Sequence, residues 1–352
     1  MELSTAGGRS QIASTRVFLP GSTIVKVSQA AAPDHVLLGD IGATNARLAL
    51  LSDGVLGPVA SFTVADFARF ADAVDAFLSH RRRDFPPTNA LFAAAGPIDS
   101  NRCALTNCPW TIEPRELCAA FGFEHVHLVN DFEATALSLS HLADSDLYPL
   151  GGGQAVSGAP MAVLGPGTGL GVACLIPGSP TPVVVAGEGG HATMSATTGR
   201  EDAIINYLRQ RFGHVSAERV VSGSGLENLY GAIVALDGVH APKRNAAEIT
   251  AAAIEGGCPT AKAALDLFCE MLGTIAGNVA LTFGARGGVY IAGGIAPRII
   301  DYLARSQFRA RFEEKGRFKS YLEAIPSKVI VHPVATFLGL RSIVRYDRST
   351  TY

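Results

Sequence analysis

The sequence lacks the features that mark secreted, membrane and nucleic-acid-binding proteins. Its six cysteines contain no C-x-x-C pair and follow no signal sequence, so we interpret them as free thiols in a reducing cytoplasm. No uninterrupted apolar run approaches the roughly 20 residues that span a bilayer, and we expect no membrane association. Basic residues number 29 against 31 acidic ones, and the one tight basic cluster is Arg81–Arg83. That cluster is too short to form a nucleic-acid-binding surface.

The composition is that of a folded globular chain that is too long for a single core. Hydrophobic residues make up 48% of the chain, as is usual for a globular protein. Its 352 residues exceed the usual size of a single hydrophobic core, which predicts two domains with a cleft between them. Residues 1–33 are rich in small and polar residues and poor in acids, and we interpret them as a disordered N-terminal extension that precedes the fold. A targeting peptide would share this composition.

The apolar pattern repeats in the two halves of the chain. Two apolar stretches at 36–42 and 46–52 flank a glycine-containing turn, and a third extended stretch lies near 58–64. After a glycine-rich link at 151–153, the stretches 161–176 and 182–190 restart the same strand, turn, strand pattern. Alternating helices and strands follow each opening, which predicts an α/β protein with two similar domains flanking a central cleft.

The turn that opens the first half has the composition of a phosphate-binding turn. It reads Gly39-Asp40-Ile41-Gly42-Ala43-Thr44-Asn45, where small residues let backbone N–H groups approach phosphate oxygens and the Thr44 hydroxyl can donate as well. Asp40 at the strand end can hold a metal ion that accompanies the phosphates. An ordinary hairpin turn has a similar composition, so this motif alone decides nothing.

A second turn with the same character opens the second half. Gly165-Pro166-Gly167-Thr168-Gly169-Leu170-Gly171 again joins two apolar strands, with Thr168 at its centre. Two such turns at equivalent places favour phosphate binding over coincidence. Neither matches the Walker A pattern, so a P-loop protein is excluded.

Polar residues that suit catalysis and sugar binding follow other strands. Asn130-Asp131 ends the strand predicted at 125–132, where a carboxylate could remove a proton from an attacking hydroxyl or could cap the next helix. Carboxylates and an imidazole on glycine-rich loops, namely Glu188, His191 and Glu218, have the directional hydrogen bonding that a ring of hydroxyls requires. Gly293-Gly294, after a strand, could lie against a nucleotide.

The motifs that carry a resemblance to a known family, in order and spacing, are GDIGATNARL, TNCPW, LVNDF, GPGTGLGVA, GEGGH, GHVSAERVVSGSGLENLY and AGGIAPR. Through these motifs the chain resembles the bacterial glucokinases that lack a zinc site. The resemblance runs from about residue 35 to 346. It implies two RNase H-like domains of the actin/hexokinase type: a small one from 34–141 plus 332–352, and a large one from 142–331. It also implies a cytoplasmic homodimer.

The resemblance assigns roles to individual residues. It implies that Asp131 is the base that deprotonates the 6-hydroxyl of glucose, with ATP and Mg²⁺ as the other reactants. The implied sugar contacts are Asn130, Glu188, His191 and Glu218. The implied nucleotide contacts are Gly39, Asp40, Gly42, Thr44, Asn45, Gly167, Thr168, Gly169, Gly293 and Gly294, and Asp40 is also the implied Mg²⁺ ligand.

Some alternatives remain open at this point. Another hexose, such as mannose, fructose or an amino sugar, could be the substrate, and a nucleotide-switched binding protein or a catalytically silent sugar sensor would share the phosphate turns. The chain also departs from the family pattern, which has a second glycine where Ala43 stands. We expect backbone strain at Ala43 if the turn needs a positive φ there, and weaker phosphate binding as a result.

Overall fold

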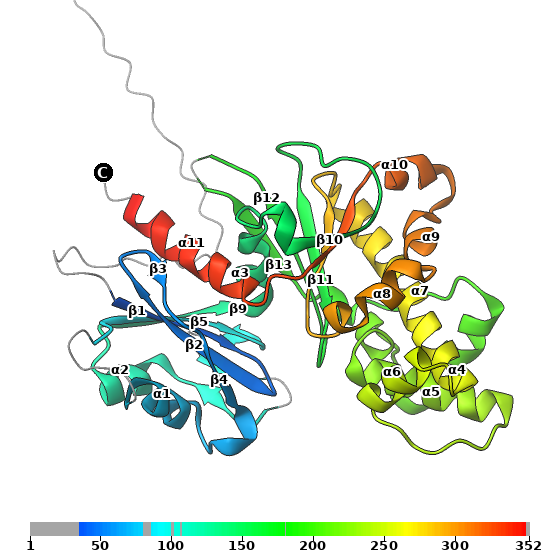
Figure 1. Ribbon diagram of the computed structural model, residues 1–352, viewed down its shortest axis with the longest axis horizontal. Helices are drawn as coiled ribbons and strands as arrows, with labels where there is room; N and C mark the ends of the chain where they lie inside the picture. Colours follow the sequence, from blue (N-terminus) through cyan, green and yellow to red (C-terminus); the bar gives the residue numbers. More distant parts are fainter. Residues whose placement is uncertain (1–34, 80–85, 100–101, 106–107, 180, 350–352) are drawn as a thin grey trace, which may run out of the picture.

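The computed structural model describes residues 35–79, 86–99, 102–105, 108–179 and 181–349 (Figure 1). The expected extension at 1–33 and the basic cluster Arg81–Arg83 lie outside the described residues.

The first half of the chain forms a mixed sheet whose strands alternate buried side chains between two faces. Its strands are β1 (His35–Ile41), β2 (Asn45–Ser52), β3 (Val55–Leu56), β4 (Ala60–Thr63), β5 (Asn89–Ala94) and β9 (His125–Asn130). Their order is β3-β2-β1-β5-β9, with β4 also paired to β2. Strand β1 runs antiparallel to β2 and parallel to β5, and β5 runs parallel to β9.

Helices cover both faces of this sheet. Leu37 and Ile41 face the side where α1 (Phe70–Ser79) and α2 (Pro114–Phe121) pack, whereas Val36 and Leu38 face α11 (Ala335–Ser349), as the two-residue period of a strand requires. Figure 1 shows these helices on opposite sides of the sheet. Three short strands form a separate antiparallel sheet: β6 (Ile98–Asp99), β7 (Arg102–Ala104) and β8 (Thr111–Ile112).

The second half repeats the topology of the first, which confirms the predicted α/β class and the internal repeat. Its strands are β10 (Leu147–Gly151), β11 (Met161–Pro166), β12 (Leu170–Ile176), β13 (Val183–Gly187), β14 (Val289–Ile291) and β15 (Ser327–Ile330). The order is β10-β15-β14-β11-β12-β13, in which the first three strands of the repeat are antiparallel and β14 and β15 are parallel, as in the first half.

The glycine-rich stretch at 151–153 does not act as the expected link between the halves. Gly151 ends β10, which pairs with β15 and extends the second sheet by one strand beyond the repeat. The adjoining Gly152 and Gly153 lie against the backbone of Ile325 and Ala324. These glycines therefore allow a close packing contact within the second half.

A helical layer covers the outer face of the second sheet. It contains α4 (Gly199–Phe212), α5 (Gly223–Asp237), α6 (Ala246–Ile254), α7 (Pro259–Phe283), α8 (Ile300–Arg305), α9 (Phe308–Glu313) and α10 (Lys319–Glu323). Single 3₁₀ turns lie at Val64–Asp66, Asp144–Asp146, Gly189–His191, Ala217–Arg219, Ala296–Ile299 and Gly316–Phe318. Within the described residues, α7 alone is long and apolar enough to cross a membrane, and 78% of its most apolar window is buried in the core.

Two helices lie between the sheets and join the halves. Helix α3 (Asp131–Ser138) packs on α11 on one side, and on β11, β12 and β13 on the other. Helix α11 follows β15, so the chain returns to the first sheet after completing the second (Figure 1). The closest approach is at Gly339 of α11, where an added Cβ would lie 1.8 Å from the carbonyl oxygen of Ala134 in α3.

We predict that Gly339→Ala destabilises the protein by about 2 kcal/mol or more, because the new methyl meets backbone, which cannot rotate away. Its matched control is Gly231→Ala in α5, where an added Cβ meets nothing within 4 Å. That change should be neutral or stabilising by up to about 1 kcal/mol, since alanine favours helix. Denaturant unfolding of both variants measures the difference, and similar effects for the two would contradict this account of the helix crossing.

Candidate active site

A cavity of about 630 Å³ lies between the two halves. The residues that line it come from the carboxyl end of the first sheet and from the turn and loops of the second. Among the predicted site residues, the cavity brings together Gly42, Asn130, Asp131, Gly167, Thr168, Gly169, Glu188, His191, Glu218 and Gly293.

Asn130 and Asp131 have different structural roles where β9 ends and α3 begins. Asn130 is the N-cap of α3, and its Oδ1 accepts hydrogen bonds from the N–H groups of Phe132 at 2.9 Å and Glu133 at 3.3 Å. Asp131 is the first helical residue, and its Oδ1 accepts a second, 3.0 Å bond from the Phe132 N–H. Because Asn130 supplies the cap, the Asp131 carboxylate is left to face the cavity.

The electrostatic environment keeps Asp131 ready to accept a proton. Burial in the cleft, and next the negative charge of Asp40, raise the pKa of Asp131 to about 7, with a smaller contribution from Glu188. The Phe132 N–H opposes this shift by stabilising the anion. A carboxylate with a pKa near neutrality suits a general base, because it is partly ionised and still binds a proton well.

Three of the four side chains predicted to bind a sugar, Glu188, His191 and Glu218, lie on loops of the second half. Glu188 and His191 are exposed to the cavity, with Oε2 and Nε2 3.8 Å apart. Glu218 reaches across to the second turn, where its Oε2 accepts the N–H of Leu170 at 2.9 Å. Within the part of the chain that the structure describes, no hydrogen bond engages its Oε1, which remains available to a ligand. Glu218 therefore connects the loops that carry the predicted sugar contacts to the second turn.

The second predicted turn is held in place by neighbouring elements. The Gly167 N–H donates to Gly169 within the turn, and the Gly167 carbonyl accepts the N–H of Gly223 at 2.9 Å. Gly223 is the first residue of α5, so the positive end of that helix lies beside the turn, as suits an anion. Gly293, after β14, adopts a φ of 80° against the Pro166 carbonyl and completes this wall.

The first turn is more open, and its residues divide into two groups. Gly42 lines the cavity, and Thr44 and Asn45 are exposed at the same turn. Gly39 lies inside β1, where the ring of Phe92 would be 2.6 Å from an added Cβ, so its missing side chain serves packing. Gly294 follows Gly293 on the surface, outside the lining.

The strain expected at Ala43 is absent. Among the described residues, Asp53 is the sole non-glycine with a positive φ, so Ala43 occupies an ordinary backbone conformation. The turn is closed by a 3.0 Å bond from the Gly42 N–H to the Asn45 carbonyl, which requires no left-handed residue. The methyl of Ala43 therefore gives no reason to expect weaker phosphate binding.

Several residues at the site were not predicted from the sequence. Phe132, next to Asp131, packs so closely on the second turn that an added Cβ at Gly171 would lie 1.9 Å from its ring. Arg47 forms an ion pair with Asp40 and donates to the Pro333 carbonyl at 2.8 Å. Ala95–Pro97 lines the cavity at the carboxyl end of β5, where the parallel pairing with β1 and β9 could have indicated it.

The charges of the site suit a magnesium ion that arrives with phosphate. Mg²⁺ is usually held by one or two carboxylates together with substrate phosphates, and no group of three or more His, Cys, Asp or Glu in the described residues forms a metal cage. Asp40 is nearly buried and uses Oδ2 for Arg47, which leaves Oδ1 for another partner. The residues present therefore fit a metal bound mainly through the nucleotide.

Three comparisons with known proteins all find glucokinases. The glucokinase family model matches residues 37–346. A glucokinase of Paramagnetospirillum magneticum is 47% identical over 88% of this chain and 97% of its own length, and one of Nitrobacter hamburgensis is 42% identical over 87% and 96%. The crystal structure of a glucokinase from an Antarctic psychrotroph is 35% identical, covers 89% of this chain and 99% of its own, and superposes with a TM-score of 0.77.

We predict that Asp131→Asn stabilises the fold at high pH. Since the folded pKa lies above the ordinary 3.8, the folded protein binds more protons than the unfolded chain between about pH 4 and pH 7, and stability falls as pH rises through that window. Asparagine keeps the acceptor for the Phe132 N–H without the buried charge. The expected gain at pH 8 is about 1–2 kcal/mol, or roughly 1–3 °C in Tm for a chain of this length.

The gain should shrink towards pH 4, where wild-type Asp131 is itself protonated. Thermal unfolding across this pH range checks the prediction, with Asp75→Asn on the exposed side of α1 as the control. An equal Tm for wild type and Asp131→Asn at pH 8 would show that the carboxylate is not held at a cost.

Proposed function

The chain belongs to the glucokinase family and transfers the γ-phosphate of ATP to glucose, and we propose that Asp131 is the general base of this reaction. One observation carries the assignment: the Asp131 carboxylate faces a cavity whose other walls are the second glycine-rich turn and the loops with Glu188, His191 and Glu218. A sugar in that cavity would have an acceptor for its proton on one side and the nucleotide phosphates on another.

The proposed step transfers one phosphoryl group and one proton. The 6-hydroxyl oxygen of glucose attacks the γ-phosphorus, and the bond from that phosphorus to the bridging oxygen of ADP breaks. The hydroxyl proton passes to the Asp131 carboxylate, whose pKa of about 7 allows it to accept the proton and later release it to water. No covalent enzyme intermediate is needed.

The sugar is proposed to be held from both halves. The Asn130 Oδ1 is occupied by the helix cap, so its amide N–H₂ group would donate to a hydroxyl. Glu188, His191 and the Oε1 of Glu218 would accept from or donate to the remaining hydroxyls. Because carboxylates and an imidazole can also bind the hydroxyls of other hexoses, a coupled ADP-release assay on glucose, mannose, fructose and glucosamine defines the preference.

The nucleotide is proposed to lie across the two turns. Backbone N–H groups at Gly167–Gly169 and the Thr168 hydroxyl would bind phosphate oxygens beside the amino end of α5. The side of the phosphates opposite that turn would be formed or supported by the first turn, namely Gly39, Asp40, Gly42, Thr44 and Asn45. The nucleoside would face Gly293 and Gly294. Mg²⁺ held by Asp40 and the phosphates would neutralise charge on the transferred group.

We also propose the wider organisation that the family implies. The small domain would comprise 34–141 plus 332–352 and the large domain 142–331, with α11 returning to the first sheet. The protein would act as a cytoplasmic homodimer without nucleic-acid or membrane partners. Sedimentation velocity measures the oligomeric state directly.

Asp131→Asn should lower kcat by about 10²–10⁴-fold while glucose binding persists, because the amide keeps the hydrogen-bond acceptor but cannot take the proton. Single-turnover phosphorylation and calorimetric glucose titration separate the two effects. For the wild type, kcat/KM should fall as pH drops through about 7, where Asp131 becomes protonated. A variant with more than a tenth of wild-type kcat would place the base elsewhere.

Glucose, more than ATP, should close the cleft. A ligand that contacts Asp131 in one half and Glu188, His191 and Glu218 in the other binds the closed state better and shifts the population towards it. Closure would exclude the water that competes with the 6-hydroxyl for the γ-phosphate. Small-angle scattering should therefore show a smaller radius of gyration with saturating glucose, and ATP hydrolysis without sugar should be slow. An unchanged scattering profile would rule out this mechanism.

A further inference from the structure

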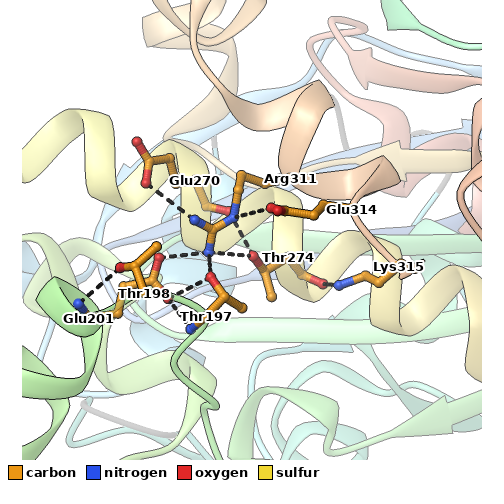
Figure 2. Close-up of polar contacts among 8 residues, drawn as sticks. All are labelled: Thr197, Thr198, Glu201, Glu270, Thr274, Arg311, Glu314 and Lys315. Carbon is orange, nitrogen blue, oxygen red and sulfur yellow. Dashed lines mark hydrogen bonds and ion pairs between the residues drawn. The ribbon is translucent and has the colours of Figure 1, made fainter.

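A buried ion pair outside the cavity is connected by hydrogen bonds to the loop that carries Glu188 and His191. Arg311 on α9 and Glu201 on α4 lie within the large helical layer, where their side chains are 9% and 0% exposed, and Arg311 Nη2 lies 2.6 Å from Glu201 Oε1. Figure 2 shows the guanidinium surrounded by Thr197, Thr274, Glu270 and Glu314. Charged side chains are rarely buried this deeply unless they are paired.

The packing of the helices explains why Arg311 reaches this place. Helix α9 crosses α7 where Gly273 and Gly277 admit the backbone of Phe308 and Phe312. This close crossing brings Arg311 over Thr274, whose Oγ1 accepts from Nη2 at 3.2 Å, and near Glu270, whose Oε2 is 3.6 Å from Nη1. The arginine is therefore positioned by the core of the second half.

From this position the pair of Arg311 and Glu201 holds the end of the segment 188–198, which carries Glu188 and His191 and is called the sugar loop below. Glu201 Oε2 accepts both the backbone N–H of Thr197 at 2.7 Å and its hydroxyl at 3.0 Å, and Arg311 Nη2 donates to the same hydroxyl. Thr197 precedes the N-cap of α4, Thr198, by one residue. The Glu201 carboxylate thus binds the backbone just before α4, and the Arg311 guanidinium binds the Thr197 side chain. The guanidinium cannot move without disturbing α7 and α9.

The bound segment leads directly to the predicted sugar contacts. Residues 192–194 pair with residues 215–217 through an isolated bridge between Thr193 and Ser216, with bonds from Met194 N to Val215 O and from Ala217 N to Ala192 O. His191 immediately precedes the first of these two segments, and Glu218 immediately follows the second. A shift at Thr197 would therefore move His191 and Glu218 together.

We propose that Arg311 and Glu201 are positioning residues for glucose, which set the geometry of His191 and Glu218 without touching the sugar. This inference rests on the proposed sugar site. It gives the buried pair a role that stability alone does not require, since apolar residues of similar volume would fill the same space. The expected consequence is a loss of glucose affinity that leaves ATP binding unchanged.

The test compares two arginines on the same helix. Arg311→Met should raise the KM for glucose by about 10–100-fold, because small displacements of binding groups are costly, and leave the KM for ATP within about twofold of wild type. Arg309→Met is the matched control. Arg309 pairs with Glu313 at 2.6 Å and donates to the carbonyls of Ile325 and Leu322, but its bonds lead to α10 and β15, away from the sugar loop.

Two milder variants keep the test valid if Arg311→Met fails to fold. Glu201→Gln preserves shape but removes the charge, and Thr197→Val removes one hydroxyl at an exposed residue. Each should raise the glucose KM in the same direction, by roughly fivefold for the lost hydroxyl bond. Calorimetric titration of glucose without nucleotide should show a parallel rise in Kd, and Tm should be measured for every variant.

Glu188→Gln separates this inference from the site on which it rests. If Glu188→Gln weakens glucose binding while Thr197→Val, Glu201→Gln and any folded Arg311 variant do not, the positioning role is wrong and the sugar site stands. If Glu188→Gln has no effect either, the sugar site itself is misassigned and the inference falls with it. An equal rise in glucose KM for Arg309→Met would also overturn the inference, because it would reduce the effect to general destabilisation.

Discussion

The close crossing of α3 and α11 is the contact on which the arrangement of the active site depends. Helix α3 carries Asp131 at its first position and packs on the second sheet, while α11 fixes α3 against the first sheet. Gly339 permits this approach because no side chain separates it from the Ala134 carbonyl. Asp131, the proposed base, is consequently held where the two halves meet, and its position relative to the second glycine-rich turn is set by helix packing rather than by a flexible loop.

The site concentrates negative charge, which raises the pKa of Asp131 and destabilises the folded protein. Burial, and after it the negative charges of Asp40 and Glu188, raise the pKa of Asp131, and the nearby cation Arg47 is bound to Asp40. A cleft with unbalanced carboxylates attracts a phosphate-bound cation and tunes a base, but it destabilises the empty protein. The proposed role of Asp131 as a base would therefore conflict with stability, whereas the buried carboxylate of Glu201 is matched by Arg311.

The two halves support the site in different ways. In the first half, functional groups lie at the carboxyl ends of parallel strands, where β5 and β9 end side by side. In the second half they lie on loops, and loops need external support to present side chains precisely. Glu218 bound to Leu170 supplies part of that support from within the cavity, and the network around Arg311 supplies another part from the core.

The sequence by itself determined the fold class, the internal repeat and most of the polar residues that line the cavity. Apolar stretches with a period of two around glycine turns predicted both openings, and Asn130-Asp131 could be located because strand ends in such folds carry function. The tertiary structure alone decided that Asn130, and not Asp131, caps α3, that Ala43 is unstrained, and that Gly39 serves packing. It also revealed Phe132 and Arg311, whose partners are distant in the chain: Arg311 is 110 residues from Glu201. Arg47 pairs with nearby Asp40 but also donates to Pro333, which is 286 residues away. Local patterns report the period and the composition of a segment, whereas such pairings arise only when helices from separate parts of the chain pack together.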